Sequence, residues 1–293
     1  MPKIHPHLST AQRKQRSIKN SVSFSGIGVH TGKEVSMRFR PAPENSGILF
    51  KRVDLPDQPI IPANVNSVCD TLRSTSIGSG TTRINTVEHV LAAVKAFDID
   101  NLLIEISNVE PPIGNGSSDV FVKMIEDAGI VEQKAITHIA KINEPIYSSE
   151  KDMHIVALPC DNEFRISYVL NYPDSKILNA QFYSVSVNAK SFCSEIASCR
   201  TFSRYEEVSA LMDRGLIKGG SLDNAVIIKD NVVFSKEGLR FPDEPVRHKI
   251  LDMIGDLSLV GCPFYAHVIA IRSGHSVNFQ LSKKISQYIY SEE

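Results

Sequence analysis

The stretch EPVRHKILDMIGDLSLVG, residues 244–261, predicts an amphipathic helix that decides the fold. At about 100° per residue, one arc of this helix forms an apolar core stripe made of Ile250, Met253, Ile254 and Leu257. The opposite arc carries polar groups at intervals of four residues, together with a lysine and a glycine: His248, Asp252, Asp256, Lys249 and Gly255. The helix therefore has one face for a core and one face whose purpose needs an explanation.

Two interpretations of the polar arc stay open on this stretch alone. A solvated helix face with a His–Asp pair at i,i+4 contributes only a few tenths of a kcal/mol, about 0.2–0.5. A metal site is the alternative, because a neutral imidazole and a carboxylate one turn apart can bind the same ion. The solvated face is the simpler interpretation until a third ligand is found.

The segment INTVEHVLAAVKAF, residues 84–97, supplies that ligand. It predicts a second helix whose apolar stripe is Val87, Val90, Leu91 and Val94. Glu88 and His89 point away from this stripe, beside alanines that let another group approach closely. His89, His248 and Asp252 together make a set of two histidines and one carboxylate, which leaves zinc an open position for water. Glu88 is then placed to take a proton from that water.

A second functional histidine occurs in IRSGHSVN, residues 271–278. His275 follows a predicted strand, at a turn that we expect to expose it. A hydrogen bond from the imidazole N–H to the Asp256 carboxylate would favour the charged imidazolium, which can protonate a leaving amine. Hydrolysis of an amide needs such a donor, because an amide anion is a poor leaving group.

Length and composition limit the class of protein. The 293 residues are 42% hydrophobic and 22% charged, as in a globular chain, and the formal net charge is −1. A net charge this close to zero provides no positive electrostatic field that would attract nucleic acid. No apolar run reaches the length of a membrane span. The five cysteines form no C-x-x-C pair, which favours a reducing compartment, so we expect a cytoplasmic protein.

Strand patterns mixed with occasional helices predict an α+β fold. The basic residues 1–15 read as a flexible leader, and a polar passage at 132–152 is the best candidate for a domain junction. We therefore expect an N-terminal α+β domain at 16–138 and a C-terminal α+β domain at 139–293.

Six motifs occur in an order that resembles one known family: GIGVHTGK, TVEHVLAA, RTF, GLIKGGSLDNAVI, LRFPDEPVRHKILDMIGDL and SGHSVN. They are similar to those of the zinc-dependent UDP-3-O-acyl-N-acetylglucosamine deacetylases of Gram-negative lipid A biosynthesis. The resemblance covers roughly residues 15–285. It implies two similar two-layer α/β sandwich domains with the active site at their interface. It also implies release of acetate from the 2-acetamido group of an acylated UDP-sugar, the committed step of that pathway.

The resemblance assigns roles to particular residues. It implies zinc ligands at His89, His248 and Asp252, with one zinc per chain, and Fe²⁺ also suits these donors. Glu88 resembles the general base, and His275 the general acid, oriented by Asp256. Thr201 resembles the hydroxyl that stabilises the oxyanion. The resemblance also implies substrate contacts for the residues His30, Lys249 and Phe202, and for Leu211 and Leu216 in an acyl-passage insert around 202–222.

Departures and alternatives accompany this resemblance. Asn115 stands where the resemblance implies the family's usual aspartate, and Ser74 stands at the position of a cysteine found in several members. We expect a monomer that acts on a small-molecule substrate, binds no nucleic acid, and has at most peripheral contact with the inner membrane. The alternatives are a non-haem iron oxygenase with the same ligand set, and a non-catalytic protein that binds a nucleotide sugar or acyl chain.

Overall fold

Two predicted helices, α1 (Glu88–Ala96) and α5 (Glu244–Ser258), pack against each other at the centre of the molecule. The computed structural model describes residues 5, 8, 10–213 and 215–290. The four residues of the predicted core stripe on α5 are completely buried, as expected: Ile250, Met253, Ile254 and Leu257. The polar arc is buried as well, because α1 covers it, so the interpretation as a solvated face is wrong.

Gly255 permits this close packing. A Cβ atom at Gly255 would lie 2.1 Å from the carbonyl oxygen of Glu88, which is shorter than any real contact. The backbones of α1 and α5 therefore approach each other at the first turn of α1, which carries His89, and about one turn after Asp252 on α5. This crossing brings residues that are far apart in the sequence into one site.

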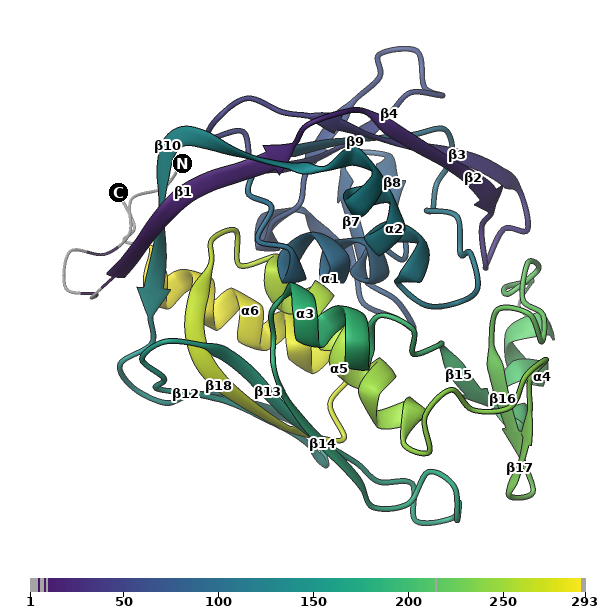
Figure 1. The fold of residues 1–293 in the computed structure, drawn as a ribbon. Helices are drawn as coiled ribbons and strands as arrows, with labels where there is room; N and C mark the ends of the chain where they lie inside the picture. Colours follow the sequence, from purple (N-terminus) through teal and green to yellow (C-terminus); the bar gives the residue numbers. More distant parts are fainter. Residues whose placement is uncertain (1–4, 6–7, 9, 214, 291–293) are drawn as a thin grey trace.

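A five-stranded sheet covers one side of the helices, in the order β2-β3-β9-β4-β5 (Figure 1). Its strands are β2 (Val22–Ile27), β3 (Glu34–Pro41), β9 (Leu102–Ile106), β4 (Ile48–Arg52) and β5 (Ile60–Pro62). Val35, Met37 and Phe39 alternate with exposed residues along β3, the pattern of a strand with one buried face. Helix α2 (Asp119–Ala128) contacts β2 and ends at Gly129, whose φ of 68° suits glycine.

A seven-stranded sheet includes strands from both halves of the chain. Its path is β1-β10-β18-β12-β11, and β18 also pairs with β13, which pairs with β14. The strands are β1 (Thr10–Ile18), β10 (Ile130–Lys141), β11 (Ile146–Glu150), β12 (Met153–Leu158), β13 (Phe164–Leu170), β14 (Gln181–Ser186) and β18 (Phe264–Ile271). Figure 1 shows the helices lying between β12–β14 with β18 on one side and the N-terminal strands on the other. The α+β class is thereby confirmed.

Shorter elements complete the described part of the chain. A three-stranded sheet contains β6 (Val68–Asp70), β7 (Ser76–Ser79) and β8 (Thr82–Ile84), preceded by the 3₁₀ turn Val65–Ser67. Before the insert lie the one-turn helix α3 (Ala189–Ser191) and a π-helical turn, Phe192–Ile196. The insert predicted around 202–222 falls in a separate layer that extends to Phe234 and is called the insert from here on: β15 (Phe202–Arg204), α4 (Tyr205–Asp213), β16 (Val226–Lys229) and β17 (Val232–Phe234).

Two predicted boundaries differ from the structure. The leader predicted for residues 1–15 is partly wrong, because β1 begins at Thr10 and pairs antiparallel with β10. Residues 1–4, 6, 7 and 9 of that leader lie outside the described residues. The division predicted at 138/139 falls inside the continuous strand β10, whereas domain boundaries normally fall in linkers. The arrangement as two similar domains stays a prediction.

One predicted turn is the start of a helix. His275 is the first residue of α6 (His275–Ile289), and its side chain is only 10% exposed, so the expected exposed turn is wrong. The stripe Val277, Leu281 and Ile285 is completely buried and holds α6 against its neighbours. In the described part of the chain, no helix is long and apolar enough to cross a membrane. The five cysteines are all free.

Candidate active site

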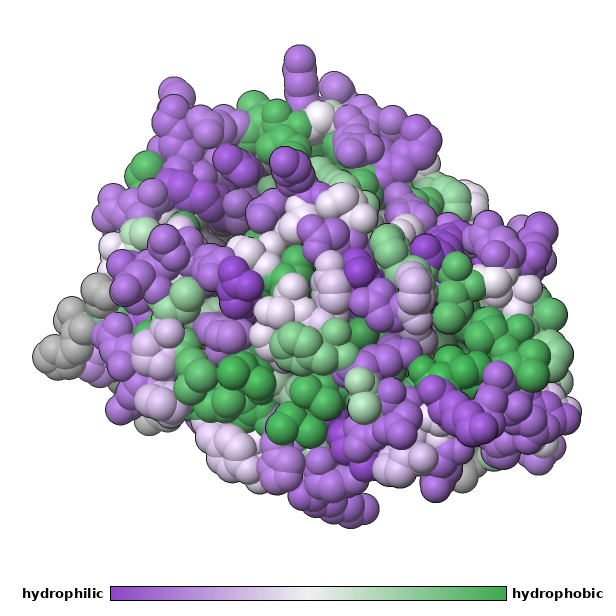
Figure 2. Space-filling model, turned by 60° about the horizontal axis from the view of Figure 1, so that its bottom comes forward, coloured by the Kyte–Doolittle hydropathy of each residue, from purple (hydrophilic) through white to green (hydrophobic). Residues whose placement is uncertain are grey.

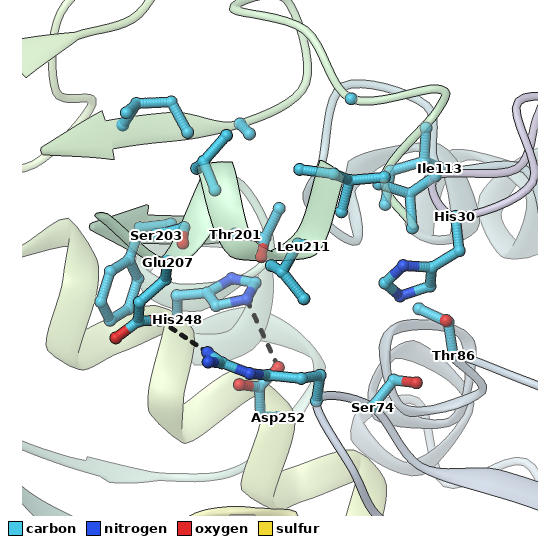
Figure 3. A pocket seen from close by; sticks show the side chains of 18 of the residues that line it. His30, Ser74, Thr86, Ile113, Thr201, Ser203, Glu207, Leu211, His248 and Asp252 are labelled. Carbon is cyan, nitrogen blue, oxygen red and sulfur yellow. Dashed lines mark hydrogen bonds and ion pairs between the residues drawn. The ribbon is translucent and has the colours of Figure 1, made fainter. Parts of the chain in front are cut away.

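A cavity of about 530 Å³ lies where α1, α5, the start of α6 and the insert meet. Nine of the predicted side chains line it: Glu88, His89, His248, Asp252, His275, Thr201, Lys249, Phe202 and Leu211. His30 joins them from the glycine-rich turn after β2, and Figure 3 shows its ring directed toward the same space. The cavity therefore collects groups from both ends of the sequence.

Leu216 is not among the residues that line the cavity, so its contact with the acyl chain stays a prediction. Its backbone N–H donates to the carbonyl of Leu211 and closes the chain over the end of α4. Ile217, the next residue, lines the cavity instead. Val208, Met212, Leu222 and Ile227 of the insert add further apolar lining, and Val29 and Ile113 add apolar lining from the N-terminal half of the chain.

His89, His248 and Asp252 form a group that can hold a metal ion. Their nearest ligand atoms all lie within 4.8 Å of one another, and all three residues are buried. The Nε2 atoms of His89 and His248 lie 3.6 and 3.4 Å from Asp252 Oδ1. Two imidazole nitrogens and one carboxylate oxygen are the donors of an open zinc site.

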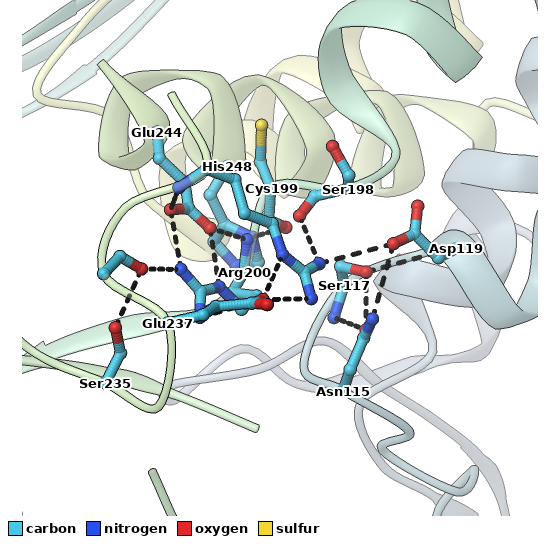
Figure 4. A network of polar contacts seen from close by, with 12 residues as sticks. Asn115, Ser117, Asp119, Ser198, Cys199, Arg200, Ser235, Glu237, Glu244 and His248 are labelled. Carbon is cyan, nitrogen blue, oxygen red and sulfur yellow. Dashed lines mark hydrogen bonds and ion pairs between the residues drawn. The ribbon is translucent and has the colours of Figure 1, made fainter. Parts of the chain in front are cut away.

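The ring of His248 is oriented by the main chain. The carbonyl of Cys199 accepts a hydrogen bond from His248 Nδ1 at 3.0 Å, which leaves Nε2 as the nitrogen facing Asp252. Beside Cys199, the buried Arg200 forms an ion pair with Glu244 in the first turn of α5 (Figure 4). Because Glu244 accepts from both the backbone and the side chain of Arg200, this pair fixes the 199–201 segment to α5.

The protonation of these groups suits a metal ligand set. Burial lowers the pKa of His248 to about 4, although Asp252 opposes the shift, so this imidazole is neutral at pH 7. Burial by itself would raise the pKa of Asp252, but the neighbouring Lys249 ammonium is the main group that holds it well below its usual value. Neutral imidazole and ionised carboxylate are the forms that bind metal.

Glu88, Asp256 and His275 form a second cluster next to the first. Burial raises the pKa of Glu88 above its ordinary value. Burial opposes the charge on His275, but the Asp256 carboxylate, 2.9 Å from its Nδ1, outweighs this and raises the pKa to about 9. The cavity thus places an ionisable carboxylate of raised proton affinity near an imidazolium, the arrangement of a base and an acid.

Two residues around Asp256 are absent from the sequence-based prediction. Asn278 Nδ2 donates to Asp256 Oδ2 at 2.8 Å, and the Thr75 hydroxyl donates to Oδ1 at 2.5 Å. The i,i+3 spacing of His275 and Asn278 would have indicated the first, had α6 been predicted. Nothing in the sequence points to Thr75, which comes from the short segment before β7.

Asn115 stands at the position where the resemblance implies an aspartate. Its side-chain oxygen accepts hydrogen bonds from the backbone N–H and from the hydroxyl of Ser117.

The surface near the cavity carries exposed apolar side chains. Five of them belong to the insert: Tyr205, Met212, Leu222, Val232 and Phe234. Figure 2 shows apolar surface gathered at the right-hand side, where the insert lies in Figure 1. The insert therefore provides much of the apolar lining of the cavity as well as this outer apolar surface.

The fold and this site define a protein of mixed α/β architecture in which a buried carboxylate and an imidazolium lie beside a possible metal-binding group. The chain belongs to the LpxC family of UDP-3-O-acyl N-acetylglycosamine deacetylases, whose model matches residues 15–287. It is therefore a hydrolytic deacetylase that acts on an amide, which decides against the oxygenase and the non-catalytic binding protein.

Curated relatives cover nearly the whole chain. The UDP-3-O-acyl-N-acetylglucosamine deacetylase of Chlamydia felis is 50% identical over 274 residues, 94% of this chain and 97% of the relative. Those of Chlamydia abortus and Chlamydia trachomatis serovar L2 are 49% and 48% identical, over 95% and 96% of this chain and 99% and 98% of their own. The matched region includes all of the residues that line the cavity.

Proposed function

We propose that the chain hydrolyses the 2-acetamido group of UDP-3-O-acyl-N-acetylglucosamine, giving UDP-3-O-acyl-glucosamine and acetate, the committed step of lipid A biosynthesis. The observation that carries this proposal is one cavity in which a His–His–Asp group, a carboxylate and an imidazolium meet an apolar lining. The names of the relatives support the same substrate.

His89, His248 and Asp252 would hold the metal ion, one per chain. The fit rests on the donor set and on the Cys199 carbonyl, which commits Nδ1 of His248 and leaves Nε2 for a ligand bond. Zinc is the ion we propose, and ferrous iron suits the same donors. When bound, the ion supplies the Lewis acidity that activates water and polarises the acetamide carbonyl.

Glu88 takes the proton from the attacking water in this proposal. Its carboxylate is held by the backbone N–H of Thr75 at 3.0 Å, so it is oriented before substrate binds. Burial raises its proton affinity, which suits a base that must accept a proton near neutral pH.

His275 gives its proton to the leaving nitrogen. Its Nδ1 faces Asp256, which keeps the imidazole charged and leaves Nε2 as the donating nitrogen. Asp256 is 1% exposed and touches His275 rather than the cavity, so it acts through the histidine.

The remaining groups bind and orient substrate. Thr201 lines the cavity beside His248 and would donate its hydroxyl to the developing oxyanion. Lys249 and His30 would contact the polar sugar, while Phe202 and Leu211 would contact the acyl chain. We further propose a cytoplasmic monomer, whose exposed apolar insert allows peripheral contact with the inner membrane.

Acetate release tests the substrate directly. The purified chain should release acetate from UDP-3-O-acyl-N-acetylglucosamine and far less from UDP-N-acetylglucosamine, because the second compound leaves the apolar lining unfilled. Release from neither compound, at any acyl length and with metal bound, would overturn the proposed function.

A further inference from the structure

Thr75 lies at the junction of the two proposed proton-transfer groups. It is 1% exposed and immediately precedes β7. Its backbone N–H donates to Glu88 Oε2 at 3.0 Å, and its hydroxyl donates to Asp256 Oδ1 at 2.5 Å. Its carbonyl accepts the N–H of Val87 at 3.1 Å, directly before α1. Each of its polar groups is therefore committed to the base, to the partner of the acid, or to the helix that carries the base.

The direction of the hydroxyl bond follows from the chemistry of its neighbours. An ionised carboxylate only accepts, so the Thr75 hydroxyl must donate to Asp256. The other oxygen of Asp256 already faces His275 and Asn278, at 2.9 and 2.8 Å. Thr75 therefore completes the set of donors that fixes the rotation of this carboxylate, and with it the ring of His275.

The choice of threonine adds stiffness to this arrangement. A β-branched side chain has fewer χ1 rotamers than serine, so its hydroxyl direction is better defined. The same hydroxyl lies 3.3 Å from His275 Nδ1, and one carboxylate oxygen of Glu88 lies within 4.8 Å of a ring nitrogen of His275. A small rotation of the Thr75 side chain would therefore change the positions of both Glu88 and His275.

We propose that Thr75 is a positioning residue that holds Glu88 and the Asp256–His275 pair in one fixed relative geometry. This inference rests on the proposed function, in which these groups are the base and the acid. It predicts that loss of the hydroxyl affects the chemical step and leaves metal binding and substrate affinity nearly unchanged.

Thr75→Val tests the proposal, because valine keeps the shape and the backbone N–H and removes only the hydroxyl. We expect kcat to fall about 10–100-fold, as when a partner behind a ligand or catalytic group is lost. KM and zinc content should stay within about twofold of the wild-type values. Thr75→Ser should recover most of the rate.

Ser17→Ala provides the matched control. Ser17 is also 1% exposed, and its hydroxyl donates to the carbonyl of Asn101 at 2.6 Å, away from the cavity. Ser17→Ala should lose about as much unfolding free energy as Thr75→Val does, and it should keep the wild-type kcat. An unchanged kcat in Thr75→Val, an equal fall in Ser17→Ala, or loss of zinc from Thr75→Val would each overturn the positioning role.

The proton NMR signal of His275 Nδ1–H separates this inference from the proposed function, because it needs no substrate. We expect the signal, assigned by its absence in His275→Gln, to shift in Thr75→Val and to return in Thr75→Ser. A signal unmoved by the loss of the hydroxyl would contradict the inference even in an active enzyme. Absence of acetate release by the wild-type chain would instead contradict the proposed function.

Discussion

Glu88 is the residue on which the proposed chemistry depends most. Its carboxylate is buried beside the ligand group without belonging to the set His89, His248 and Asp252. Glu88→Gln should therefore lower kcat by about 10²–10⁴-fold, the usual contribution of a general base. Zinc content, measured by elemental analysis of the same preparation, should stay unchanged. Loss of zinc from Glu88→Gln would make Glu88 a structural residue.

The pH dependence of the rate follows from the pKa shifts of Glu88 and His275. Glu88 must be ionised and burial raises its pKa, so activity falls as the pH decreases through that value. His275 must be protonated, and with Asp256 outweighing the effect of burial its pKa is about 9, so activity falls as the pH rises past about 9. The profile of kcat/KM against pH should be bell-shaped. His275→Gln should remove the alkaline fall, and a fall that persists in this variant would exclude His275 as the acid.

Helix α5 depends on a buried ion pair at its first turn. Arg200 and Glu244 are each 1% exposed, so Glu244→Gln leaves the buried guanidinium with only the longer, more exposed pair to Glu237 at 3.6 Å. The variant should lose about 3–5 kcal/mol of unfolding free energy at pH 7. Urea denaturation of both proteins measures this difference, and a loss below about 1 kcal/mol would mean that water replaces the carboxylate.

The same pair has a predictable response to acid. Burial would raise the pKa of Glu244, but hydrogen bonds from Arg200 and Arg240 outweigh it and hold the pKa below its ordinary value. A lowered pKa in the folded state stabilises the fold at neutral pH, and this stabilisation disappears as the pH falls through the folded-state value. The stability difference between wild type and Glu244→Gln should therefore shrink in acid. A difference that is constant with pH would contradict the ionised pair.

The crossing of α1 and α5 can be tested at Gly255. A Cβ atom there meets the backbone of Glu88, which cannot move aside as a flexible side chain can. Gly255→Ala should cost about 1–3 kcal/mol and weaken zinc binding, because the helices that carry His89 and His248 must separate. Gly274→Ala is the control for stability, since nothing lies within 4 Å of its Cβ position. Equal stability of the two variants would contradict the close crossing.

At the scale of the whole molecule, the sequence predicts helices better than it predicts what covers them. Periodicity alone places Ile250 and Met253 in a core, and the structure confirms both. The burial of His248 and Asp256 depends on α1, more than 150 residues earlier, and no local pattern contains that contact. The alanine-lined face beside His89 was the one local sign that another element lies close.

Strand β1 shows the same limit. Its sequence TAQRKQRSI has no apolar alternation, so it reads as part of a flexible leader. Its structure comes from pairing with β10, about 120 residues away along the chain. Thr75 escaped prediction for a related reason, because its role depends on the positions of Glu88 and Asp256 in the folded chain.

Zinc titration of the metal-free chain tests the central claim most directly, with acetate release and bound zinc measured in the same samples. We predict that the rate rises linearly, saturates at about one zinc per chain, and stays near zero in His248→Ala and Asp252→Ala, which should also fail to retain zinc. A rate that is independent of zinc, or full zinc binding by these variants, would contradict the site formed by His89, His248 and Asp252.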